Sequence, residues 1–248
     1  MNLLVDLGNA RIKWARTRPG SWQAGAASLH AKALDQLFDT VWADTPAPQK
    51  VVVACVANQK ILQALDRWVL RHWSLQAHVV KAQHELLGVK NHYRDPATLG
   101  ADRWVALIAA HRMSTTPLSI VDCGTAVTID ALSAQGEFLG GVILPGLHLL
   151  RSSLVGATHE IRQVNGDDTS CLGLSTADAV TAGSAFGLAG AIERILTEQA
   201  KRLGKDTRVL MTGGDAARVL PRLRVEAPVE HVPDLVLRGL ALIAEEVL

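Results

Sequence analysis

The 248-residue sequence has few aromatic side chains, few cysteines and almost no net charge. Aromatic residues make up 4% of the chain, so its core must consist mainly of alanine, valine, leucine and isoleucine. The formal net charge of +1 argues against binding nucleic acid or an anionic membrane by bulk electrostatics. The three cysteines stand far apart without a CxxC pair, which argues against a fully paired, secreted framework.

Long apolar runs are lacking as well. Asp6 interrupts the apolar N-terminal residues and no basic stretch precedes them, so we expect no signal peptide. The run at residues 139–150 is short and is broken by glycine and proline, so we expect no membrane span. These absences predict a soluble, cytoplasmic protein with neither nucleic acid nor a membrane as a partner.

Short strand-like runs alternate with helical stretches along the chain. Strands are predicted at residues 2–6, 11–15, 51–55, 78–80, 118–122, 126–132, 137–144 and 208–211. The clearest helices are predicted at residues 61–72, 101–112, 177–202 and 234–248. This alternation indicates an α/β fold.

One short segment occurs twice. Residues 5–10, VDLGNA, return 116 residues later as residues 121–126, VDCGTA, and an apolar strand precedes each copy. Each copy predicts a β-hairpin whose tip carries a carboxylate and accessible backbone amides. A structural glycine turn would explain one copy equally well, but two copies indicate duplicated halves, 1–116 and 117–248. Such halves place the two turns face to face across a cleft.

The two turns offer what a nucleoside triphosphate needs: close backbone amides, hydrogen-bond donors and carboxylates that organise cations. These groups come in pairs, from Gly8 and Gly124, Asn9 and Thr125, and Asp6 and Asp122. Lys13 on the next strand is placed either to neutralise a phosphate or merely to lie in solvent.

A third glycine turn, Thr212-Gly213-Gly214, follows an apolar run and precedes a predicted helix. Paired glycines at a strand-to-helix junction let a flat ring lie against the main chain, which suits adenine. Taken alone, the same residues are equally typical of a tight turn.

The order of these motifs resembles the actin, sugar kinase and Hsp70 superfamily of ATP-binding proteins, and in detail it is similar to the type III pantothenate kinase family. The resemblance covers nearly the whole chain: Asp6-Leu7-Gly8-Asn9 with Lys13, Gly100-Ala101-Asp102-Arg103, Asp122-Cys123-Gly124-Thr125-Ala126 with Thr128, Gly140-Gly141 with Pro145-Gly146, and Thr212-Gly213-Gly214. It implies duplicated actin-like (ribonuclease H-like) domains with a nucleotide cleft between them. It also implies ATP-dependent phosphorylation of the primary hydroxyl of pantothenate to 4'-phosphopantothenate, the first step of coenzyme A biosynthesis.

The segment Gly100-Ala101-Asp102-Arg103 opens a predicted helix. An aspartate at this position either caps the helix or serves the chemistry. Arg103 is expected to lower the pKa of Asp102 and to offer a forked donor to a substrate carboxylate. Phosphoryl transfer needs one carboxylate that orients the attacking hydroxyl and accepts its proton, and Asp102 fits that role.

By resemblance, Asp102 is the general base and Asp122 binds a monovalent cation, K⁺ or NH₄⁺. Asp6 takes part in binding Mg²⁺, directly or through water. The substrate is held by Tyr93, Gly100, Ala101, Asp102, Arg103 and Thr176, and ATP by Asp6, Gly8, Asn9, Lys13, Gly124, Thr125, Gly213 and Gly214. Two positions depart from the family pattern, because Ala10 stands where Thr or Ser is common and Ser175 where Asn is more usual.

Several alternatives remain at this stage. Gly183, Gly187 and Gly190 fall on one helix, where they serve either an intramolecular helix crossing or the interface of a homodimer, which the family forms. A non-catalytic nucleotide-binding regulator and a sugar or acetate kinase would share the same fold. The intact Asp102 and Arg103 favour pantothenate kinase over both.

Overall fold

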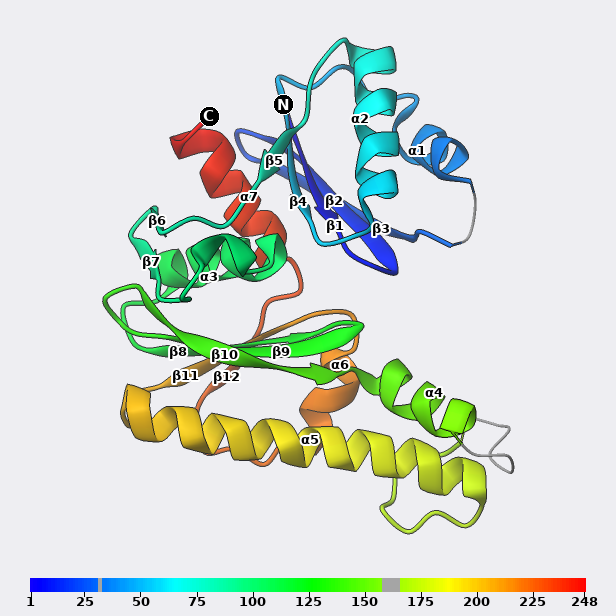
Figure 1. Cartoon of the computed structure of the whole chain (residues 1–248), viewed down its shortest axis with the longest axis vertical. Coiled ribbons are helices and arrows are strands. Elements are labelled where there is room, and N and C mark those ends of the chain that lie inside the picture. Colours follow the sequence, from blue (N-terminus) through cyan, green and yellow to red (C-terminus); the bar gives the residue numbers. More distant parts are fainter. Residues whose placement is uncertain (31–32, 158–165) are drawn as a thin grey trace. The chain divides into compact units, whose positions relative to one another are not determined.

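The computed structural model describes residues 1–30, 33–157 and 166–248. The chain separates into two compact units. The first consists of residues 1–113 and 234–248, and the second of residues 114–233. The elements of both units are labelled in Figure 1.

The first unit contains a sheet with the strand order β3-β2-β1-β4-β5. Its strands are β1 (Asn2–Leu7), β2 (Arg11–Arg18), β3 (Ser21–Ser28), β4 (Lys50–Cys55) and β5 (His78–Val80). Strands β1, β2 and β3 form an antiparallel meander, whereas β4 is parallel to β1 and β5 is parallel to β4.

Helices cover both faces of this sheet, which explains the continuous apolar run of β1. Leu3, Val5 and Leu7 face a core shared with α1 (Leu34–Trp42) and α2 (Gln59–Trp73). Helices α3 (Ala101–Met113) and α7 (Leu235–Glu246) pack on each other and on the sheet. The hairpin of β6 (Glu85–Leu86) and β7 (Val89–Asn91) and the turn η1 (Pro96–Thr98) lead into α3.

The C-terminal helix α7 belongs to the first unit. Its Gly239 lies against the carbonyl oxygen of Val105 in α3, and a side chain there would collide with that backbone. The division predicted from the sequence, into residues 1–116 and 117–248, places this helix in the second half. In the structure α7 packs on α3 and belongs to the first unit, although it lies at the end of the chain.

The second unit repeats the same topology. Its strands are β8 (Leu118–Cys123), β9 (Ala126–Leu132), β10 (Glu137–Pro145), β11 (Arg208–Thr212) and β12 (Val229–His231). They lie in the order β10-β9-β8-β11-β12, with an antiparallel meander followed by two parallel strands. The five strands of the second unit therefore correspond one for one to the five strands of the first sheet, as the repeated motif predicts.

The described residues of the second unit also form the helices α4 (Leu147–Ala157), α5 (Thr176–Leu203) and α6 (Ala216–Val219) and the turn η2 (Leu220–Arg222). Helix α5 runs along the sheet of the second unit (Figure 1). Its buried leucine, isoleucine and alanine side chains share one hydrophobic core with residues of β8, β9 and β11. Among the described residues, α5 is the one helix long and apolar enough to cross a membrane. Half of that stretch is buried inside the unit, as in the core helix of a soluble protein.

Every predicted strand and helix is present, with its ends shifted by three residues or fewer. Strand β3 is the longest strand that the sequence did not reveal, and helices α1 and α4 were not predicted either. In β3, Gly25 lies against the indole of Trp14, where a side chain would have no room.

Candidate active site

The first glycine turn joins β1 to β2 and brings Asp6 and Lys13 together. The two residues are paired across the hairpin, and the Lys13 ammonium nitrogen lies 4.0 Å from the Asp6 carboxylate. The Gly8 N–H donates to the Arg11 carbonyl at 3.1 Å, which closes the turn, and Asn9 is exposed at its tip. The predicted hairpin is confirmed, and Lys13 pairs with a carboxylate of its own hairpin rather than lying only in solvent.

Asp102 lies in the first turn of α3. Its Oδ1 accepts a hydrogen bond from the Arg103 N–H at 2.7 Å and lies 2.7 Å from the position where a Cβ of Gly100 would stand. Gly100 therefore leaves room for this carboxylate to fold back over the start of the helix.

Burial raises the pKa of Asp102 above its ordinary value. The Arg103 N–H, the Arg103 charge and the Lys13 charge all act in the opposite direction without outweighing burial. Arg103 does lower the pKa of Asp102, as expected, but burial is the larger effect and the net shift is upward. A buried carboxylate with a raised pKa is a better proton acceptor than an exposed one.

The thiol of Cys55 lies among the same carboxylates. Burial raises its pKa, and the charges of Asp6, Asp66 and Asp102 add to that rise. Its register partner on β1 is Leu7, the residue next to Asp6. Asp6, Lys13, Cys55 and Asp102 thus lie near one another in the first unit, as the electrostatic coupling among them indicates.

Tyr93 and Arg103 form a pair beside Asp102. The Arg103 guanidinium donates to the Tyr93 hydroxyl at 2.9 Å and also lies 5.5 Å from the centre of the ring. Arg103 is 7% exposed, so its forked donor is held in one place. The structure thus brings together two of the residues predicted to hold the substrate.

Buried Asn91 braces the segment that carries Tyr93. Its Oδ1 accepts from the Tyr93 N–H at 3.0 Å and its Nδ2 donates to the Pro96 carbonyl at 3.1 Å. Asn91 is 3% exposed. The sequence analysis did not identify Asn91, although an asparagine whose side chain bonds the backbone two residues on is typical of a turn.

The second and third glycine turns lie together in the second unit. The Gly124 N–H donates to the Ala126 carbonyl at 3.1 Å, and the Asp215 N–H donates to the Cys123 carbonyl at 2.9 Å. Gly213 has a φ of +96° and touches the Asp122 carboxylate and the Cys123 backbone, so no other residue would fit. Gly214 and Thr125 are exposed beside this junction.

Cys123 is buried at the same junction. Burial, followed by the charges of Asp122 and Asp215, raises the pKa of the Cys123 thiol to about 12. The thiol therefore stays protonated and acts as a small apolar residue.

Thr176 stands apart from these turns. It is the exposed first residue of α5, directly after the N-cap Ser175, whose Oγ accepts from the Asp178 N–H at 3.1 Å.

The residues present suit cations that are bound together with phosphate. In the described part of the chain, no three His, Cys, Asp or Glu side chains gather into a metal site. Single carboxylates such as Asp6 and Asp122 match the way Mg²⁺ is held, by one or two carboxylates with substrate phosphates and water.

Two units of this topology, each with a strand-end aspartate followed by a glycine turn, define the actin-like ATPase fold. The solved structure of a protein described as a conserved Baf family transcriptional activator from Campylobacter jejuni matches with a TM-score of 0.62. The match covers 98% of both chains at 20% identity, which shows the fold alone.

Sequence relatives give the family. A family model for type III pantothenate kinase matches residues 2–198. Type III pantothenate kinases from Nitrosococcus oceani and Aromatoleum aromaticum are 37% and 40% identical over 253 and 246 residues. These alignments cover 99% of this chain in both cases, and 94% and 98% of the relatives. The chain therefore belongs to the type III pantothenate kinase family, and its activity is the ATP-dependent phosphorylation of pantothenate in coenzyme A biosynthesis.

Proposed function

We propose that Asp102 is the general base that accepts the proton of the primary hydroxyl of pantothenate as the γ-phosphoryl group of ATP is transferred to it, giving 4'-phosphopantothenate. The observation that carries this proposal is the environment of Asp102. Its carboxylate is largely buried, has a raised pKa and is held at 2.7 Å by the Arg103 N–H. Such a group can both orient a hydroxyl and take its proton.

Arg103 and Tyr93 are proposed to bind pantothenate. A guanidinium offers two parallel donors to the substrate carboxylate, and the buried stem of Arg103 fixes their direction. Gly100 and Ala101 bring the substrate close to the backbone at the start of α3, next to Asp102. Holding the hydroxyl and the base in one geometry supplies much of the rate enhancement of such a reaction.

The turns of both units are the proposed binding residues for ATP. Gly8, Asn9 and Lys13 in the first unit and Gly124 and Thr125 in the second contact phosphates, whereas Gly213 and Gly214 face the adenine. Asp6 takes part in binding Mg²⁺, directly or through water, and Asp122 binds K⁺ or NH₄⁺. When bound, these cations neutralise charge on the phosphates.

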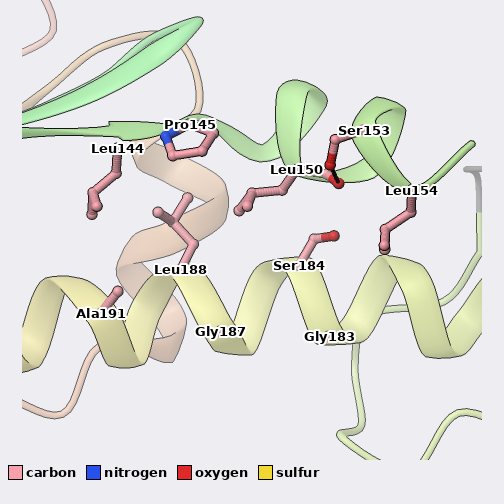
Figure 2. Close-up of a pocket in the computed structure, with 10 residues that line it drawn as sticks. All are labelled: Leu144, Pro145, Leu150, Ser153, Leu154, Gly183, Ser184, Gly187, Leu188 and Ala191. Carbon is pink, nitrogen blue, oxygen red and sulfur yellow. Dashed lines mark hydrogen bonds between the residues drawn. The ribbon is translucent and has the colours of Figure 1, made fainter. Parts of the chain in front are cut away.

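A homodimer is the proposed assembly, and its best support is the surface of α5. Gly183, Gly187 and Gly190 are exposed, and a Cβ added at any of them would meet nothing within 4 Å. No helix crossing inside the described chain therefore uses these glycines. Figure 2 shows Gly183 and Gly187 beside an apolar cavity of about 300 Å³ between α4 and α5.

The residues just before α5 support the same assembly. Leu174 is 96% exposed and Leu172 is 77% exposed, next to the predicted substrate contact Thr176. A second copy that covers these leucines would bring Thr176 to the substrate of its partner. The enzyme is proposed to act in the cytoplasm, where its three unpaired cysteines stay reduced.

The test is a coupled assay of ADP formation with ATP, Mg²⁺, K⁺ and pantothenate. Loss of a general base costs roughly 10²- to 10⁴-fold in kcat, which is the expected result for Asp102→Asn. The matched control is Asp95→Asn, because Asp95 is a nearby carboxylate that only caps η1. Full activity of Asp102→Asn would show that Asp102 is not the general base. ATP binding by folded wild-type protein without pantothenate-dependent turnover would instead favour a non-catalytic regulator.

A further inference from the structure

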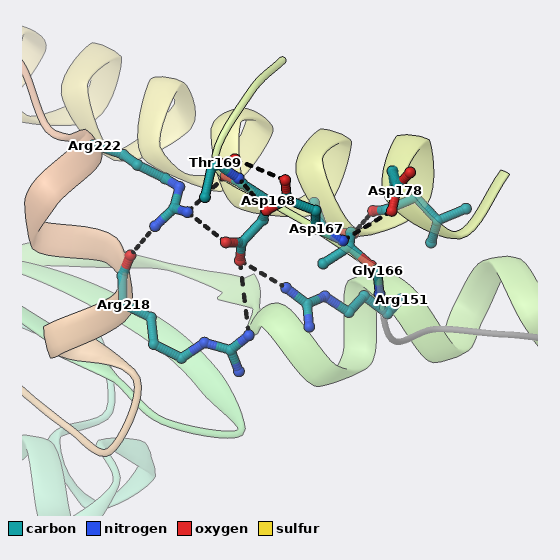
Figure 3. Close-up of polar contacts among 11 residues, drawn as sticks. Arg151, Gly166, Asp167, Asp168, Thr169, Asp178, Arg218 and Arg222 are labelled. Carbon is teal, nitrogen blue, oxygen red and sulfur yellow. Dashed lines mark hydrogen bonds and ion pairs between the residues drawn. The ribbon is translucent and has the colours of Figure 1, made fainter. Parts of the chain in front are cut away.

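Three arginine side chains converge on one carboxylate in the second unit, at Asp168 (Figure 3). Arg222 Nη2 lies 2.6 Å from Asp168 Oδ1. Arg151 Nη2 and Arg218 Nη2 lie 3.5 Å and 3.7 Å from Asp168 Oδ2. Arg151 belongs to α4, Arg218 to α6 and Arg222 to η2, so one side chain links three helical elements.

The segment that carries Asp168 is fixed along α5. The Gly166 N–H donates to Thr181 Oγ1 at 2.9 Å, and the Asp167 N–H donates to Asp178 Oδ1 at 2.9 Å. Arg222 also donates to the main-chain carbonyl of Asp168 at 2.6 Å. The Asp168 carboxylate is therefore a fixed point against which the arginines are held.

Both helices that reach Asp168 begin at the glycine turns. At the start of α4, the Gly146 N–H donates to the Thr125 carbonyl at 3.0 Å, and Gly146 lies so close to the Gly124 carbonyl that no side chain would fit. Helix α6 begins directly after Gly214 and Asp215. A shift of either helix would therefore move a turn.

The charges of the three arginines are compensated by the Asp168 carboxylate. The Arg151 side chain is 9% exposed, and its Nε and Nη2 have no hydrogen-bond partner in the part of the chain that the structure describes. Burial lowers the pKa of Arg151, and the charge of Arg218 adds to that effect, whereas Asp168 and Asp215 oppose it. Without Asp168, the buried guanidinium would face two neighbouring cations with less compensation, and the helices would tend to separate.

We propose that Asp168 is a positioning residue for the nucleotide: it neutralises Arg151, Arg218 and Arg222 and so keeps the starts of α4 and α6 at the spacing that the second and third glycine turns need to hold ATP. This inference rests on the proposed role of those turns. It assigns Asp168 no contact with either substrate.

The test compares Asp168→Ala with Asp167→Ala. Asp167 is the adjacent carboxylate, but its side chain is exposed and accepts hydrogen bonds from Thr169 of its own loop; its N–H bond to Asp178 is kept in the alanine variant. ATP affinity is measured by calorimetry, and KM is measured separately for ATP and for pantothenate. For Asp168→Ala, a misplacement of the turns predicts a loss of ATP affinity between about 10- and 100-fold, with the KM for pantothenate unchanged. Asp167→Ala keeps both values.

A rescue experiment separates charge from folding. Asp168→Ala leaves a carboxylate-sized space among three guanidinium groups, so acetate or formate should restore ATP affinity to this variant and leave the wild type unchanged. If the alanine variant does not fold, Asp168→Asn, which keeps the size and removes the charge, serves for the same affinity measurement. Unchanged ATP affinity in a folded variant would overturn the proposal, as would equal losses for ATP and pantothenate without rescue. Failure of the wild type to bind ATP would instead overturn the proposed function of the turns.

Discussion

Substituting Gly100 by alanine should displace the Asp102 carboxylate, the proposed general base, while leaving the fold intact. The added Cβ would stand 2.7 Å from Asp102 Oδ1, and its next neighbour, Val56 Cγ1, is at an ordinary 3.6 Å. The overlap with Oδ1 is about 0.7 Å, measured against the 3.4 Å at which ordinary contact begins. The carboxylate is the mobile partner and must turn away from the position that the Arg103 N–H now fixes.

A displacement of this size is large for catalysis and small for stability. Misplacing a reacting group by about 1 Å costs up to about 100-fold in rate, so we expect kcat to fall between about 10- and 100-fold. Gly100 does not have a positive φ, so alanine fits the backbone there. Because alanine leaves the unfolded chain less conformational freedom than glycine, the substitution raises the free energy of unfolding by about 0.4–1 kcal/mol. That gain offsets part of the strain at Asp102, and the melting temperature should change little.

The assay is steady-state kinetics with a thermal melt of the same preparation, and Gly156→Ala is the control. Gly156 is an exposed glycine on α4 with nothing within 4 Å of an added Cβ. The double variant Gly100→Ala/Asp102→Asn should be no slower than Asp102→Asn alone, because the first change acts through the second residue. A folded Gly100→Ala enzyme with wild-type kcat would refute the reasoning.

Three further predictions concern the proposed base Asp102, the proposed dimer interface and the binding of pantothenate. Because the folded-state pKa of Asp102 is raised, its stabilising contribution is fully present below its unfolded pKa and is lost as pH rises through the folded pKa. Asp102→Asn should therefore unfold at a higher temperature than the wild type at neutral pH, and the two should unfold alike at low pH. As the pH is lowered, the wild-type kcat/KM for pantothenate should begin to fall at a higher pH than it would with an aspartate of ordinary pKa, because the base becomes protonated sooner. Gly187→Leu should give monomers in sedimentation experiments, whereas Lys201→Leu, farther along the same helix, should not. Asn91→Ala should raise the KM for pantothenate about tenfold without changing that for ATP, and should shift the NMR signals of Tyr93, the one tyrosine of the chain.

The parts of the site that the sequence predicted are those made by local geometry. Asp6 and Lys13 meet because a hairpin with a glycine turn pairs residues a few positions apart, and the pattern of residues 5–10 is enough to predict that hairpin. Gly213 could be identified for a similar reason, since a strand-to-helix turn is visible in the chain order.

The parts that the sequence concealed depend on contacts between distant elements. Asp168 and Arg222 are 54 residues apart, and neither falls in a motif or a periodic pattern. Strand β3 was missed because its serine, alanine and glycine residues lack β propensity, and Gly25 is there to make room for Trp14. The sign of the Asp102 shift was also beyond the sequence, because Arg103 is visible there and the extent of burial is not.

The two hairpins share a fold but differ in the residue that stands opposite the aspartate. Asp6 is paired with Lys13 across the first hairpin, whereas Asp122 is paired with Thr128 across the second. An ammonium group beside Asp6 competes with a metal ion for that carboxylate, while the residue opposite Asp122 carries an uncharged hydroxyl. Monovalent cations such as K⁺ are held by oxygen ligands without a neighbouring positive charge. The two copies therefore suit different proposed tasks: the first carboxylate would act near the phosphates through Lys13 and a water-bound Mg²⁺, and the second would bind the monovalent cation directly.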